Sequence, residues 1–285
     1  METRYDVRPS PIAGHWYDAD PKRLAAKVDR YMDEAQLPPI TGEIVGIMAP
    51  HAGHLYSGPV AGYAFAALRG MQPEVVAVVS PMHYPYYQAL LTTSHTAYAT
   101  PLGQIPIDLE ALQKLDACLK EEGALTLARV ARDPEHSLEI ELPFLQRALK
   151  GAFKLLPVMM LEQNKTQARR LGTALAKTLA GRQALLVAST DLSHFYPQEV
   201  ARTLDQEILQ RVEAFDPDGV IQAEEEGKGF ACGRGAVAAV LWAAKDLGAD
   251  KVTLLHYATS GDVTGDYSQV VGYGAAVITR SLRNA

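Results

Sequence analysis

The chain has 285 residues, 48% of them hydrophobic and 21% charged, with a formal net charge of -6 and a pI of about 5.8. This length and apolar content predict one large α/β domain over residues 1–285. The acidic balance, without a cluster of Lys or Arg, argues against a nucleic-acid partner, and no apolar run reaches the length of a membrane span.

Residues 1–20 are expected to form an N-terminal arm packed on this domain. The arm is charged, contains prolines and lacks the apolar core of a signal peptide, so we expect a cytoplasmic protein. Asp20 followed by Pro21 is typical of a helix start. Two interpretations of Trp16 stay open: together with Tyr17 it is a hydrophobic staple of the arm, or it forms an aromatic rim over the mouth of a binding site.

Strand and helix patterns alternate along the rest of the chain. Apolar runs of strand length predict strands over 44–48, 74–81, 88–95, 153–160, 182–194, 251–262 and 268–279. Helical spacing predicts helices over 21–35, 59–68, 108–122, 142–149, 164–181, 200–215, 216–227 and 233–248. The proline-broken stretch 97–108 is expected to be a partly extended connection. The alternation predicts a central, mostly parallel β-sheet flanked by helices.

Polar residues that suit chemistry follow three of the predicted strands. His51 follows the first strand, His83 follows the second, and Asp191 and His194 end the strand over 182–194. The carboxyl ends of parallel strands meet at one edge of a sheet, which is where ligands bind in open α/β folds. These side chains are therefore expected to converge.

The two cysteines differ in their surroundings. Cys118 lies in the predicted helix 108–122 and is expected to be a small buried hydrophobe, and a disulfide with Cys232 is not expected in a cytoplasmic chain. Cys232 lies among glycines just before the helix 233–248, whose N-terminus would favour a thiolate. It is either a packing residue or a ligand. Two imidazoles and a thiolate would make a three-ligand site for a divalent metal with open positions.

Six motifs, in this order, resemble the Memo family over nearly the whole chain: RPSPIAGHWYDAD, APHAGHLYSGPVAGYAF, SPMHYPY, EHSLEIELPFLQ, STDLSHF and ACGRGA. That family is similar in fold to the class III extradiol dioxygenases, in which two histidines and a carboxylate hold Fe(II). The resemblance implies that His51, His83 and Cys232 are the metal ligands. It also implies that His194 is a further site histidine with Asp191 beside it.

Three more residues are candidates for substrate binding: Trp16, His54 and His136. His54, three residues after His51, either supports the site or is a turn residue. His136, with Ser137 next to it, either caps the following helix or lines the pocket, and the resemblance favours the pocket.

Three functions follow from such a site. We favour a metal-dependent, O2-using oxidoreductase acting on a small chelating molecule, with His194 as acid/base and Asp191 orienting its ring. The alternatives are a metallohydrolase and a non-catalytic module that binds a peptide or small molecule in the metal cleft. Fe(II) is the expected metal, while the thiolate also suits copper or zinc. The oligomeric state stays open.

Overall fold

Nine strands form the central sheet of the computed structural model, which describes residues 6–123 and 125–282. Its centre is parallel and consists of β2 (Glu43–Ala49), β9 (Ala184–Ser189), β3 (Val75–Pro81) and β8 (Lys154–Met160). One edge is antiparallel and consists of β12 (Val270–Arg280), β11 (Lys251–Thr259) and β10 (His194–Tyr196). At the other edge β4 (Leu90–Thr93) runs antiparallel to β8, with β7 (Leu127–Val130) beside it. The sheet is thus mixed, and the predicted parallel arrangement applies to its centre.

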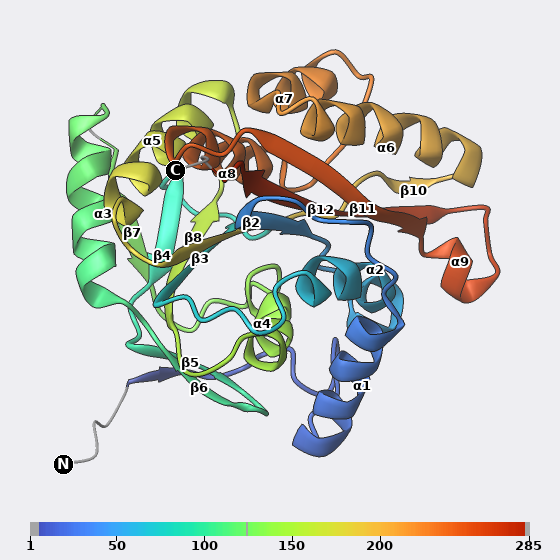
Figure 1. The fold of residues 1–285 in the computed structure, drawn as a ribbon, viewed down its shortest axis with the longest axis horizontal. Helices are drawn as coiled ribbons and strands as arrows, with labels where there is room; N and C mark the ends of the chain where they lie inside the picture. Colours follow the sequence, from blue (N-terminus) through green and yellow to red (C-terminus); the bar gives the residue numbers. More distant parts are fainter. Residues whose placement is uncertain (1–5, 124, 283–285) are drawn as a thin grey trace.

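Helices cover both faces of this sheet, as Figure 1 shows. One layer contains α1 (Pro21–Glu34), α2 (His54–Ala66) and α4 (Leu142–Ala148). The other contains α3 (Leu109–Glu121), α5 (Lys165–Leu179), α6 (Gln198–Glu213), α7 (Pro217–Glu225) and α8 (Arg234–Asp246). A short 3-10 helix, η1 (Glu139–Glu141), precedes α4, and α9 (Gly261–Thr264) connects β11 to β12.

The core explains why the central strands are continuous apolar runs. Every residue of β3 is buried, because the sheet carries helices on both faces. The predicted α/β architecture is confirmed. Among residues 6–123 and 125–282, no helix combines the length and the apolar composition that a membrane span requires.

A second, three-stranded sheet includes the N-terminal arm. β1 (Val7–Arg8) pairs in parallel with β5 (Ala97–Thr100), which forms an antiparallel pair with β6 (Gly103–Pro106). The stretch 97–108 is therefore more regular than predicted. Arg8 is buried and donates to Asp133 and Glu139, which fixes the described part of the arm to the domain. Residues 1–5 of the predicted arm lie outside the described residues.

Two element boundaries differ from expectation in ways that shape the site. The predicted strand over 182–194 is two strands, since β9 ends at Ser189 and β10 begins at His194. α2 begins at His54 and includes Pro59, where a later start was predicted. His54 therefore belongs to the helix and not to the loop before it.

Candidate metal centre

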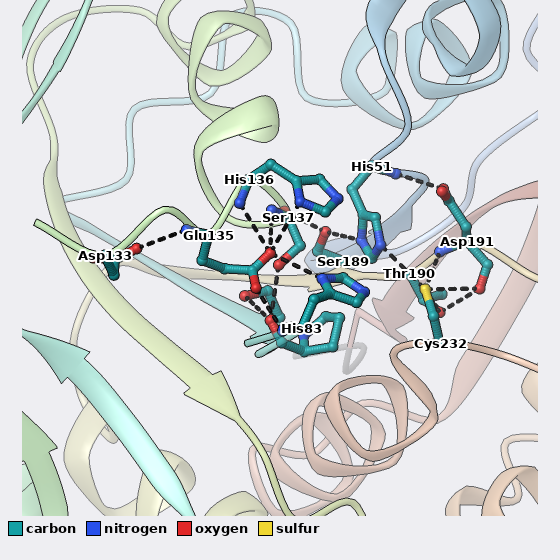
Figure 2. A network of polar contacts seen from close by, with 12 residues as sticks. His51, His83, Asp133, Glu135, His136, Ser137, Ser189, Thr190, Asp191 and Cys232 are labelled. Atoms are coloured by element: carbon teal, nitrogen blue, oxygen red, sulfur yellow. Dashed lines mark hydrogen bonds and ion pairs between the residues drawn. The ribbon is translucent and has the colours of Figure 1, made fainter. Parts of the chain in front are cut away.

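Three histidines gather beyond the carboxyl ends of the central strands. His51 follows β2, His83 follows β3, and His136 lies in the segment before η1. Their nearest ring nitrogens all lie within 4.8 Å of one another, a spacing that could hold a metal ion. Figure 2 shows the three rings around one small space. The predicted convergence of His51 and His83 is thus present, and His136, predicted on the substrate side, lies equally near.

Cys232 lies on the opposite side of the His51 ring from His136 in this view (Figure 2). Its Sγ is 3.1 Å from His51 Nε2 and accepts a hydrogen bond from the backbone N–H of Asp191 at 3.2 Å. With bonds of about 2.3 Å to sulfur and about 2.1 Å to nitrogen, two ligands of one ion at right angles are about 3.1 Å apart. This distance would suit a metal shared by Cys232 and His51. Among the described residues, however, the group spaced to hold an ion consists of His51, His83 and His136, and it does not include the expected ligand Cys232.

Glu135 supports two of the histidines, and its role was not foreseen in the motif EHSLEIELPFLQ. Its Oε1 accepts from His83 Nδ1 at 2.9 Å and from the backbone N–H of His136 at 2.9 Å, and its Oε2 accepts from the backbone N–H of His83 at 2.6 Å. Burial would raise the pKa of Glu135, but the hydrogen bonds and charge of His83 outweigh it and lower the pKa to about 2. A carboxylate behind a histidine fixes its ring and raises its basicity as a ligand.

Burial keeps two of the site histidines, His51 and His136, neutral. It lowers the pKa of His51 well below the ordinary value and that of His136 to about 4, with neighbouring histidines adding to the effect. Neutral imidazoles are the form that binds metals. Loss of water around Cys232 raises the pKa of its thiol well above the ordinary value, and the charge of Asp191 adds to this. In the metal-free protein, burial therefore outweighs any contribution of the start of α8 in favour of the thiolate.

Asp191 and His194 do not contact each other in the way that was expected. Asp191 Oδ1 accepts from the backbone N–H groups of His51 at 2.7 Å and Ala52 at 3.2 Å, so it fixes the loop after β2. Burial raises the pKa of Asp191 to about 7. The His194 ring is oriented instead by a hydrogen bond of 2.8 Å between its Nδ1 and the carbonyl of Leu192.

Of the remaining residues predicted to bind substrate, Trp16 lies next to the histidine cluster and His54 is buried in the core. Trp16 is partly exposed and packs against His136 with a centroid distance of 4.0 Å and a tilt of 30° between the ring planes, which fits the rim interpretation. His54 is buried between Tyr17 and Phe144, and its Nε2 is 3.0 Å from the carbonyl of Ile140. It therefore packs in the core beside the cluster.

The cysteines do not form a disulfide. Cys118 is buried on α3, as predicted, and both thiols are free.

Comparison with known proteins agrees with the motifs. The family model described as Memo-like protein matches residues 8–277. A MEMO1 family protein of Methanopyrus kandleri is 36% identical over 285 residues, covering 96% of this chain and 99% of the relative. A MEMO1 family protein of Methanothermobacter thermautotrophicus is 37% identical over 277 residues, covering 94% of this chain and 98% of the relative. The chain belongs to the Memo family.

Proposed function

We propose that this protein is a metal-dependent oxidoreductase that binds one divalent transition metal through His51, His83 and Cys232. The observation that supports it is the 3.1 Å contact between Cys232 Sγ and His51 Nε2 beside the cluster of histidines. Imidazole and thiolate ligands suit iron, copper and zinc, and we take Fe(II) as the resident ion. Fe(II) would supply electrons for O2 chemistry and open positions for a chelating substrate.

His136 is the rival third ligand. Its ring stacks on that of His83 at a centroid distance of 4.8 Å and packs at a tilt against Trp16, whose ring centroid is 4.0 Å away, so it belongs to a group of packed aromatic rings. We place it on the substrate side, where these rings would hold a flat ligand against the metal centre.

His194 is proposed as the acid/base. The Leu192 carbonyl can only accept, so His194 Nδ1 carries the proton and Nε2 carries a lone pair. Burial lowers the pKa of His194, which keeps the ring neutral and able to take a proton from a substrate hydroxyl.

The ligand set is tested by cobalt substitution and metal analysis. Co(II) bound to a thiolate shows a strong sulfur-to-metal charge-transfer absorption. We expect this band in the unchanged protein and in His136→Ala, and we expect its loss in Cys232→Ser, with Cys118→Ser as the matched control. His51→Ala and His83→Ala should lose metal altogether. A band that survives in Cys232→Ser, or metal content that depends on His136 and not on Cys232, would replace the proposed set by three histidines.

The catalytic role of His194 makes a separate prediction. His194→Ala should keep its metal, because the three ligands are intact. It should lose activity by about 10²-fold or more on any turnover substrate, the usual contribution of general acid/base catalysis. Loss of iron in this variant would instead make His194 a ligand.

One observation favours a second function, a module that binds a peptide or small molecule without turnover. Trp16 is partly exposed and packs against His136, which is an arrangement suited to holding an aromatic ligand. Nitric oxide separates the two functions, because it occupies the open positions of Fe(II) that O2 chemistry needs. A wild-type Fe(II) protein that fails to bind nitric oxide would favour the binding module.

A further inference from the structure

Ser189, the last residue of β9, lies behind the His51 ring. Its Oγ is 2.9 Å from His51 Nδ1, on the side of the ring away from Cys232. For Nε2 to bind a metal, Nδ1 must carry the ring proton. Ser189 must then accept a hydrogen bond from His51 Nδ1.

The same hydroxyl has two further oxygen neighbours. The Ser189 Oγ is 2.7 Å from the carbonyl oxygen of Ser137 and 2.7 Å from Glu141 Oε1. A hydroxyl has one proton to donate and two lone pairs, and the carbonyl can only accept. If Glu141 were a carboxylate, the single Ser189 proton would serve two acceptors, and one pair of oxygens would face each other at 2.7 Å without a proton between them.

A protonated Glu141 resolves all three contacts. Its acid proton goes to Ser189 Oγ, the Ser189 proton goes to the Ser137 carbonyl, and the His51 Nδ1 proton goes to the second lone pair of Ser189. The surroundings agree with this arrangement. Glu141 is fully buried, and its Oε2 has no hydrogen-bond partner among the described residues. Burial raises the pKa of Glu141 well above its ordinary value, and the nearby Asp191 adds to the shift.

We propose that Ser189 and Glu141 together are positioning residues that fix the tautomer of His51, with Glu141 present as the carboxylic acid that donates to Ser189. The two histidine ligands are then supported in opposite ways. His83 donates directly to the carboxylate of Glu135, whereas His51 donates to a hydroxyl whose orientation is fixed by a neutral acid. The role of this arrangement in metal binding rests on the proposed function. The tautomer of His51 and the acid proton of Glu141, however, are properties of the metal-free protein.

Two measurements on metal-free protein test this arrangement at pH 7.5. Nitrogen NMR of labelled histidine distinguishes protonated from unprotonated ring nitrogens, and we expect His51 to be protonated at Nδ1. Infrared absorption detects a protonated carboxylic acid apart from carboxylates, and we expect one such band to be lost in Glu141→Gln. Ser189→Ala removes the acceptor for Nδ1, so His51 should shift toward the Nε2-protonated form.

Metal affinity supplies the matched comparison. Glu141→Gln keeps a neutral donor toward Ser189 and should bind Zn(II) as tightly as the unchanged protein. Glu135→Gln removes a carboxylate behind His83 and should weaken binding by about 10–100-fold, as should Ser189→Ala. The inference is overturned if no acid band disappears in Glu141→Gln, or if this variant loses as much affinity as Glu135→Gln. If the unchanged protein binds no metal, the proposed function fails, while the NMR and infrared results still decide the state of His51 and Glu141.

Discussion

At the scale of single residues, the proton content of the ligands determines how the site responds to pH. His51 and His136 are neutral well below pH 7, because burial lowers the pKa of each. Burial raises the pKa of the Cys232 thiol, so the thiol stays protonated until a metal displaces the proton. A site completed by Cys232 therefore releases a proton on binding metal, whereas a third ligand at His136 releases none.

We predict that metal affinity rises with pH by about tenfold per unit near pH 8, which corresponds to one proton released per ion. Calorimetry in two buffers of different ionisation enthalpy counts this proton. At pH 8 Asp191, with a pKa of about 7, is mostly ionised and contributes little. Cys232→Ser should show weaker binding and no proton release. Equal proton release in both proteins would assign the proton to another group.

The sequence predicted which residues meet but not all of their contacts. His51, His83 and Asp191 could be placed together because strand ends converge at one edge of a parallel sheet. Glu135 was missed because its contacts with His83 cross 52 positions of the chain, and no local pattern encodes them. The partner of His194 was also misjudged. Asp191 is near His194 in sequence, but the backbone carbonyl of Leu192 accepts the hydrogen bond from the His194 ring instead, and sequence gives no sign of which backbone carbonyl will do so.

At the scale of elements, the start of α8 determines where Cys232 lies. The helix packs across the central strands, and its first residues approach the end of β9 very closely. A Cβ at Gly233 would collide with the carbonyl oxygen of Ser189 and with Thr190. Glycine at this position thus lets Cys232 reach His51, which explains the glycine next to the cysteine.

Gly233→Ala should therefore lower metal affinity by about tenfold or more, as the start of α8 moves away from β9. Gly172→Ala is the matched control. A Cβ at Gly172, on α5, would also press on α8, because it would collide with Trp242 and the Ala239 carbonyl. These two residues of α8 are far from Cys232 along the chain. Each variant should lose about 1–3 kcal/mol of unfolding free energy. Only Gly233→Ala should bind metal more weakly than the unchanged protein. A similar loss of affinity in both would show that general destabilisation, and not the position of Cys232, weakens the site.

The elements themselves were largely predictable, and the exceptions have physical reasons. Strongly periodic helices such as α1 and α5 appear close to their predicted bounds. β7 was missed because four residues give too little alternation to recognise. The break between β9 and β10 could not be predicted from the sequence. β9 pairs with β2 and β3, whereas β10 pairs with β12, and the sequence of residues 182–194 does not indicate this change of pairing partner.

At the scale of the whole molecule, one buried cation joins the arm to the segment that carries much of the site. Arg8 donates to Asp133 through Nε at 2.9 Å and Nη2 at 2.8 Å, and through Nη1 to Glu139. Glu139 in turn accepts from Ser10 and, at 2.7 Å, from Tyr17. The segment 133–141 includes His136 and Glu141. This ion-pair network therefore holds the arm, which carries Trp16, against the segment that carries His136.

Arg8→Ala should therefore be among the most destabilising single changes in the protein. Removing one partner of a buried ion pair leaves the other charges unpaired, which costs about 3–5 kcal/mol. Arg147→Ala is the control, because Arg147 makes an equally close two-point contact with Asp29, at 2.6 and 2.9 Å, but on a partly exposed surface. An exposed pair contributes about 0–1 kcal/mol. Urea unfolding measures both losses, and a difference of less than about 1 kcal/mol between the variants would show that Arg8 does not fix the arm. If the arm is released in Arg8→Ala, the fluorescence of Trp16, which is already partly exposed, should be quenched more strongly by a soluble quencher under native conditions. The variant Trp16→Phe separates the Trp16 signal from that of Trp242.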